Sequence, residues 1–141
     1  MKRIFMDTNV VIDFLANRQP FAMDAAKLFN LAIDGKAKIY ISAVSYNNIY
    51  YILRQSISGS AAVKLLEELA DMTEITDVTA VVIRQSLKSN FKDYEDGIQY
   101  YSALSIPKVD FIVTRNTKDF KRSKLPVLTP SEALAVVNDV L

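Results

Sequence analysis

The chain has 141 residues, of which 50% are hydrophobic, and a formal net charge of +1. This length allows a sizeable core and is typical of one domain, so we expect residues 1–141 to form a single domain. Cysteine and histidine are absent from the sequence. Their absence excludes disulfides, thiolate nucleophiles, Cys/His zinc sites and triads with an imidazole base. Catalysis is left to carboxylates, hydroxyls, lysines or a hard cation such as Mg²⁺ or Mn²⁺.

The amino-terminal segment carries Lys2 and Arg3 but only a short apolar stretch before Asp7. It is too short for a signal peptide or a membrane span. We therefore expect a cytoplasmic protein that does not act at a membrane.

Short apolar runs alternate along the chain with longer amphipathic ones. The apolar runs predict strands at 4–6, 38–42, 74–76, 110–114 and 126–128. Helical spacing of apolar residues predicts helices at 22–34, 45–55, 60–71, 79–88 and 93–104, with a last helix opening at 129–132. This order favours an α/β fold, a three-layer α/β/α sandwich around a mostly parallel central sheet.

Polar residues stand where the predicted strands end. Asp7 closes the first strand, while Asn116 and Asp119 follow the strand that ends at Thr114. Because the carboxyl ends of parallel strands face a common crevice, we expect these side chains to converge. A cap of the following helix is the structural alternative for Asp7.

Asp93 and Asp96 open a predicted helix three residues apart, so their charges share one face and repel. An ordinary first-turn acid is the structural alternative for Asp93. Asp96 lies deeper and is easier to explain with a cation beside it. Gly97 costs roughly 1 kcal/mol in a helix interior, which predicts close packing at this position.

Three segments together resemble the PIN-domain family, which includes the VapC-like toxin ribonucleases. They are Asp7–Asp13, Asp93–Gln99 and Phe111–Phe120. The resemblance spans essentially the whole chain and implies an acidic site that binds Mg²⁺ or Mn²⁺ and hydrolyses RNA to 5′-phosphate and 3′-hydroxyl products. It makes Asp7, Asp96 and Asp119 the catalytic and metal-binding residues. It also implies an antitoxin protein partner and a homodimer.

Two positions depart from the family pattern. Asn48 stands where a glutamate is usual, and Asn116 where many relatives have aspartate. An amide ligates a cation without contributing charge, so we expect weaker metal binding. A PIN fold that has lost catalysis and serves as an RNA-binding or protein-interaction module is the alternative function. Supporting roles at the site are expected for Thr8, Asn9, Asn48, Asp93, Thr114 and Asn116.

Other α/β enzymes fit less well. A haloacid-dehalogenase-type phosphatase requires a second aspartate where Asn9 stands. A receiver-type phosphoacceptor has no place for Asp93 and Asp96.

Basic residues cluster around Asp119 and would suit an RNA substrate. The predicted phosphate contacts are Arg115, Lys118, Lys121 and Arg122. A solvated surface is the structural alternative for this cluster. Tyrosines on two predicted helices, at 46, 50 and 51 and at 100 and 101, suit base stacking, a partner surface or core packing.

Overall fold

The structure is a computed structural model that describes residues 1–138. Its strands are β1 (Lys2–Met6), β2 (Ala37–Ser42), β3 (Glu74–Thr76), β4 (Phe111–Val113) and β5 (Val127–Leu128). Its α-helices are α1 (Thr8–Leu15), α2 (Ala22–Ile33), α3 (Ala43–Leu53), α4 (Gly59–Met72), α5 (Ala80–Leu87), α6 (Tyr94–Leu104) and α7 (Pro130–Asn138), and η1 (Thr117–Phe120) is a 3₁₀ helix. The predicted strand and helix segments are confirmed to within a few residues at their ends.

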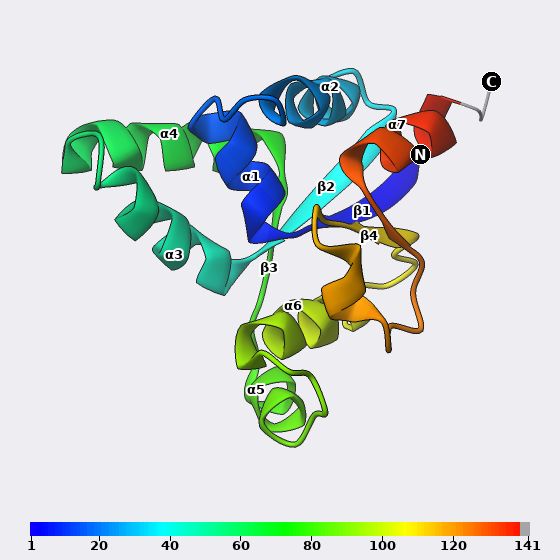
Figure 1. Cartoon of the computed structure of the whole chain (residues 1–141). Helices are drawn as coiled ribbons and strands as arrows, with labels where there is room; N and C mark the ends of the chain where they lie inside the picture. The colour runs from blue at the N-terminus through cyan, green and yellow to red at the C-terminus, as the bar shows by residue number, and fades with distance from the viewer. Residues whose placement is uncertain (139–141) are drawn as a thin grey trace.

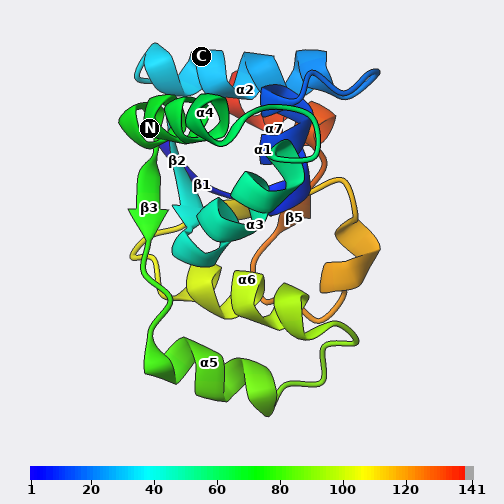
Figure 2. The ribbon, with the colours of Figure 1, turned by 90° about the vertical axis from the view of Figure 1, so that its left-hand side faces the viewer.

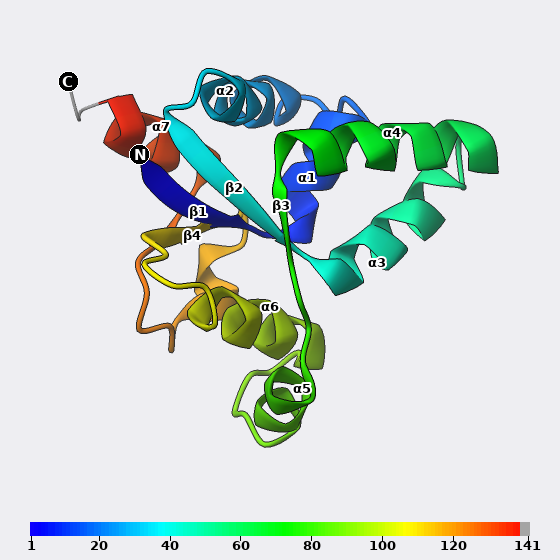
Figure 3. The same ribbon diagram turned by 180° about the vertical axis from the view of Figure 1, so that it is seen from behind.

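The five strands form one sheet in the order β3-β2-β1-β4-β5, and all neighbouring pairs are parallel. Figure 1 and Figure 2 show α1, α2, α4 and α7 on one side of this sheet and α6 on the other. Seen from behind in Figure 3, β3 forms the edge next to β2. The predicted three-layer α/β/α sandwich is thus confirmed, with a sheet that is parallel throughout.

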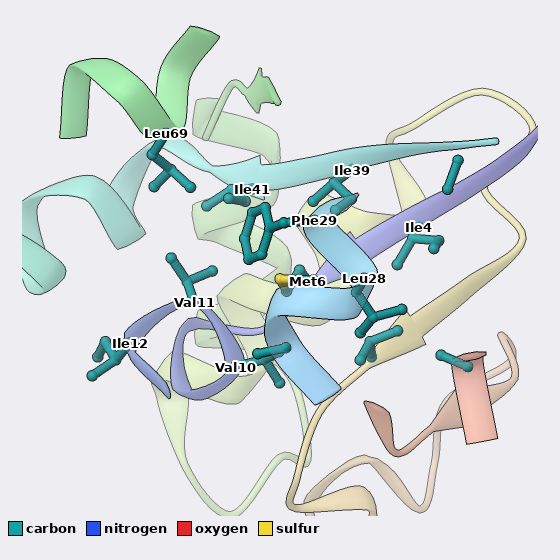
Figure 4. Packing of buried hydrophobic residues seen from close by; sticks show 14 of the residues in the cluster. Ile4, Met6, Val10, Val11, Ile12, Leu28, Phe29, Ile39, Ile41 and Leu69 are labelled. Atoms are coloured by element: carbon teal, nitrogen blue, oxygen red, sulfur yellow. The ribbon is translucent and has the colours of Figure 1, made fainter. Parts of the chain in front are cut away.

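Side-chain alternation along β1 divides the core between the two faces of the sheet. Ile4 and Met6 point to one face, where they join Leu28, Phe29 and residues of several other elements (Figure 4). Phe5 points to the opposite face and packs with buried residues of β4, α6 and η1. Both faces of the central strand are therefore covered, as a parallel sheet requires.

α5 packs against α6 (Figure 2). A Cβ placed on Gly97 would lie 3.1 Å from Ser89 Oγ and 3.5 Å from Ser86 Cβ. These distances confirm the close packing predicted for Gly97. The glycine lets the first turn of α6, which carries Asp96, lie tightly against α5.

In residues 1–138, no helix combines the length and the apolar character needed to cross a membrane.

Candidate active site

Asp7 lies where β1 ends and α1 begins, and only 8% of its surface is exposed. Its Oδ1 accepts a hydrogen bond from the Thr8 amide at 2.8 Å, and its Oδ2 accepts one from the Thr114 hydroxyl at 2.8 Å. The backbone amide of Asp7 donates to the Val113 carbonyl at 2.9 Å. Asp7 therefore caps α1, which is the structural role expected as the alternative. Its carboxylate is also fixed at the carboxyl edge of the sheet.

Asn9 and Thr114 connect Asp7 to the loop after β4. Asn9 Nδ2 donates to Asp7 Oδ2 at 3.4 Å and to Thr114 Oγ1 at 3.3 Å, and Asn9 Oδ1 accepts from the Arg115 amide at 3.4 Å. The Asn116 amide donates to Thr114 Oγ1 at 3.1 Å. Thr8, Asn9 and Thr114 thus all donate hydrogen bonds to the Asp7 carboxylate.

A cleft of about 330 Å³ opens beside Asp7 and is lined mainly by residues of α3 and α6. Its lining residues are Asp7 and Thr8, then Asn48, Tyr51 and Ile52 of α3, and Glu95, Asp96 and Gln99 of α6. The first, second and third positions of the family pattern, Asp7, Asn48 and Asp96, therefore share one cleft. The fold brings them together from three separate elements.

Negative charge is concentrated at this cleft. Burial and repulsion from Asp7, Asp93, Asp119 and Glu95 raise the pKa of Asp96 to about 7. Burial also raises the pKa of Asp7, although hydrogen bonds from Thr114 and Thr8 oppose this rise. These carboxylates repel one another when they are ionised, and a cation bound between them would relieve this repulsion.

Asp119 belongs to η1 and is exposed. Its charge contributes to the raised pKa of both Asp7 and Asp96, so it lies within electrostatic reach of the cleft. Asn116 is the exposed residue that precedes η1. Asp93 caps α6, and its Oδ1 accepts a hydrogen bond from the Glu95 amide at 2.9 Å. Asp93 thus has the capping contact of an ordinary first-turn acid, while its charge acts on Asp96.

The donor set suits a hydrated hard cation. Within residues 1–138, no three carboxylates lie close enough together to hold a metal ion directly. The carboxylates nevertheless repel one another around Asp96, and the nearby donors are all oxygen atoms or amides. Mg²⁺ keeps several water ligands and needs only one or two protein carboxylates. The residues present therefore fit such an ion.

Glu95 and Gln99 line the cleft, although sequence reasoning did not select them. Gln99 Nε2 donates to Ser45 Oγ at 3.1 Å, and Ser45 Oγ lies 2.7 Å from Thr8 Oγ1. This chain of hydrogen bonds joins α6 to α3 and α1. The signal for Gln99 was available, since a residue three positions after Asp96 shares its helix face.

The predicted phosphate contacts are in two different situations. Arg115 is paired with Asp13, with Nε 2.5 Å from Oδ2 and Nη2 3.2 Å from Oδ1, and its guanidinium lies 4.0 Å from the centre of the Phe21 ring. Its contacts are those of a structural residue. Lys118, Lys121 and Arg122 are exposed on and after η1.

The raised pKa of Asp96 predicts a pH dependence of stability in metal-free buffer. Between its unfolded value of 3.8 and about 7, the folded chain keeps a proton that the unfolded chain releases. The free energy of unfolding therefore falls as the pH rises through this range and levels off above it. Asp96 is partly exposed, so we expect a change of about 1–2 kcal/mol. Denaturant unfolding in EDTA at pH 5 and pH 8 measures it.

Asp96→Asn is the control, because it removes the titrating group. The fall between pH 5 and pH 8 should be smaller in this variant than in the unaltered protein. Equal pH profiles for the two proteins would contradict the assignment of this pH dependence to Asp96.

Comparison with known proteins identifies the family and the fold of this chain. Residues 3–118 match the family described as PIN domain. A chain in the DNA-bound VapBC structure from Salmonella typhimurium is 19% identical, with a TM-score of 0.68 over 92% of this chain and 99% of that one. A chain of VapBC2 from Rickettsia felis, bound to a promoter DNA fragment, is 19% identical, with a TM-score of 0.66 over 90% and 98%.

VapBC-1 from nontypeable Haemophilus influenzae contains a chain that is 16% identical, with a TM-score of 0.66 over 92% of this chain and 98% of that one. No curated protein sequence matches the chain. The family match covers most of the chain, and the structural matches share its fold. The chain belongs to the PIN-domain family.

Proposed function

We propose that this protein is a ribonuclease that depends on Mg²⁺ or Mn²⁺ and is the toxin of a toxin–antitoxin pair. The observation that carries this proposal is the cleft where Asp7 and Asp96 meet, with the charge of Asp119 acting on both. Asp7, Asp96 and Asp119 are the proposed ligands, directly or through water. Membership of the PIN-domain family supports a nuclease.

In the proposed mechanism, the residues that hydrogen-bond to Asp7 hold its carboxylate in the position of a metal ligand. Hydrogen bonds from Thr8 and Thr114 hold the Asp7 carboxylate at the end of the sheet. A bound Mg²⁺ or Mn²⁺ supplies an acidified water molecule and neutralises the charge that develops on the leaving oxygen. No side-chain general base is then required, which agrees with a chain that lacks histidine.

Asp96 couples metal binding to pH. Its carboxyl group, with a pKa of about 7, holds a proton part of the time at neutral pH. A cation held by the Asp96 carboxylate would compete with this proton, so affinity for the cation would fall below pH 7. Asn48 faces the same cleft from α3 and offers a neutral oxygen ligand or a hydrogen bond to the substrate.

The second candidate function is a PIN fold that binds RNA or protein without cleaving it. The observation that favours it is Asn48 in the cleft, where the family pattern has a glutamate. The absence of a close group of three carboxylates in residues 1–138 points the same way.

Cleavage of a labelled single-stranded RNA, with Mn²⁺, with Mg²⁺ and with EDTA, separates the two candidates. A nuclease releases fragments with 5′-phosphates only when the metal is present. If the RNA stays intact in all three buffers and calorimetry detects no heat of Mn²⁺ binding, the protein is the second candidate, a PIN fold that binds without cleaving.

Asn48→Glu should strengthen metal binding. The substitution places a carboxylate at the cleft position occupied by the amide, and affinity for hard cations rises with ligand charge. We expect Mn²⁺ to bind roughly tenfold more tightly, as measured by calorimetry. Asn48→Gln is the matched control, because it lengthens the side chain without adding charge. An affinity for Mn²⁺ that is the same in both variants would place Asn48 outside the metal site.

We also propose an antitoxin protein as partner, a homodimer and a cytoplasmic location. The support for the first is that similar chains occur in VapBC structures and in a toxin–antitoxin complex from Klebsiella pneumoniae, which is 21% identical with a TM-score of 0.62 over 90% of this chain and 97% of that one. Copurification of the protein with the product of a small adjacent open reading frame tests this partner.

A further inference from the structure

A second hollow, separate from the acidic cleft, lies beside the carboxyl-terminal half of α6. It has a volume of about 220 Å³ and is lined by Asn90, Phe91, Tyr100, Tyr101 and Leu104. Arg122 and Lys124 complete its wall, and no carboxylate lines it. We call these seven residues the aromatic hollow. Its composition is aromatic and basic where the cleft is acidic.

The aromatic rings of the hollow form one packed group. The Phe91 ring centre lies 5.1 Å from that of Tyr100 and 6.3 Å from that of Tyr101. Tyr100 is buried, whereas Phe91 and Tyr101 are half-buried and keep ring surface that is open to solvent. The hollow therefore offers two partly exposed rings, inclined at 71° to each other, which pack on the buried Tyr100.

The cations of the hollow lie on a loop that the same rings fix. The Lys124 amide donates to the Tyr100 hydroxyl at 3.0 Å, and Ser123 Oγ accepts from the Leu125 amide at 3.0 Å. Arg122 and Lys124 are themselves exposed. Two positive charges are thus presented at the rim of an aromatic surface, and among residues 1–138 neither has an ion-pair partner.

We propose that the aromatic hollow binds one unpaired nucleotide of an RNA strand whose scissile phosphate lies in the acidic cleft. The base stacks on the face of one ring, Phe91 or Tyr101, and meets the other at its edge, because the two ring planes are inclined at 71°. The phosphate of the nucleotide contacts Arg122 or Lys124. Stacking on aromatic rings requires a base that is not paired in a duplex. A hollow smaller than the roughly 300–1,000 Å³ of drug-sized sites suits a single flat ring.

The hollow and the cleft are separate but are both lined by residues of α6, so one strand can reach from one to the other. α6 carries Asp96 and Gln99 at the cleft and Tyr100, Tyr101 and Leu104 at the hollow. At 1.5 Å per residue, Asp96 and Tyr100 are about 6 Å apart along the helix axis. This inference rests on the proposed ribonuclease function, since it assigns the path of the same substrate.

Binding of a fluorescent eight-nucleotide single-stranded RNA, followed by anisotropy in EDTA, tests the hollow. Phe91→Leu and Tyr101→Leu remove a ring while keeping an apolar side chain. We expect each variant to bind the RNA about tenfold more weakly than the unaltered protein. Tyr94→Leu is the matched control: Tyr94 is also exposed on α6 but lines neither the hollow nor the cleft, so its affinity should be unchanged.

Two further measurements separate base from phosphate recognition. An oligonucleotide of equal length with abasic residues should lose affinity for the unaltered protein and show no further loss with Phe91→Leu. The double variant Arg122→Ala/Lys124→Ala should reduce the salt dependence of RNA binding, whereas Lys64→Ala on α4 should not. Thermal unfolding checks that each variant is folded.

The outcomes distinguish this inference from the nuclease proposal. If Phe91→Leu and Tyr101→Leu both cleave RNA and bind it with unchanged affinity, nucleotide binding at the aromatic hollow is refuted and the nuclease proposal stands. If RNA binds through Phe91 and Tyr101 but is never cleaved, the nuclease proposal is refuted and nucleotide binding at the aromatic hollow stands. A protein that binds no single-stranded RNA at all would overturn the hollow.

Discussion

Asp7→Asn is expected to abolish metal-dependent RNA cleavage, with a loss of more than about 100-fold. Changes to groups that merely orient metal ligands already cost about 10–100-fold, and Asp7 is a proposed ligand itself. The amide keeps the size of the carboxylate, and its single oxygen can still accept the hydrogen bond from the Thr8 amide, while its NH2 group can donate to the Thr114 hydroxyl, so the fold should persist. Initial cleavage rates and Mn²⁺ calorimetry on the folded variant measure the effect.

Asp34→Asn is the matched control for this loss. Asp34 is an exposed carboxylate at the end of α2, close in sequence to the start of β2 and thus at the edge of the sheet opposite the cleft. The Asp34→Asn substitution removes one negative charge outside the cleft, so the cleavage rate and the affinity for Mn²⁺ should equal those of the unaltered protein. Full activity in Asp7→Asn would remove Asp7 from the metal site and leave the cleft without its proposed centre.

Arg115→Ala is expected to lower the free energy of unfolding by about 3–5 kcal/mol. Asp13 is only 1% exposed, and the guanidinium of Arg115 contacts both of its carboxylate oxygens. Removing Arg115 leaves that buried charge without compensation, which is the costly way to break a buried ion pair. The loss is a large part of the roughly 5–15 kcal/mol that stabilises a typical protein. Urea unfolding with fitted midpoints and slopes measures it.

A second substitution shows whether the buried charge is the cause. Adding Asp13→Asn to Arg115→Ala neutralises the unpaired group and should recover part of the lost stability. Lys118→Ala, which removes an exposed cation in η1, should change stability by less than about 0.5 kcal/mol. If Arg115 serves RNA instead, Arg115→Ala will leave unfolding unchanged and raise KM.

The periodic parts of the sequence were sufficient to predict the fold. Ile4, Phe5 and Met6 form an apolar run because both faces of β1 are covered, and such a run is recognisable without a structure. The close packing around Gly97 was also predictable, because a glycine inside a helix lowers stability and is expected where a neighbour leaves no room for a side chain. Local chemistry controls these features, so local sequence reports them.

The metal site was predictable only in outline. Asp7, Asn48 and Asp96 stand at ends of elements, and a parallel sheet brings such ends together. Gln99 could have been found from its spacing to Asp96, whereas Glu95 was missed because its place in the cleft depends on how α6 is turned against α3 and β2. That rotation is set by packing against Phe5 and Ile112 under the sheet, far from these residues in the sequence.

The sequence by itself determined the α/β class, the helices and strands, and the exclusion of histidine and cysteine chemistry. Those properties depend on composition and on spacing within one element. Tertiary structure decided which partner each charged group has: Arg115 pairs with the buried Asp13, while Asp96 meets other carboxylates and has its pKa raised to about 7. The energy of a charge depends on burial and on neighbours brought from distant segments, and only the folded chain fixes both.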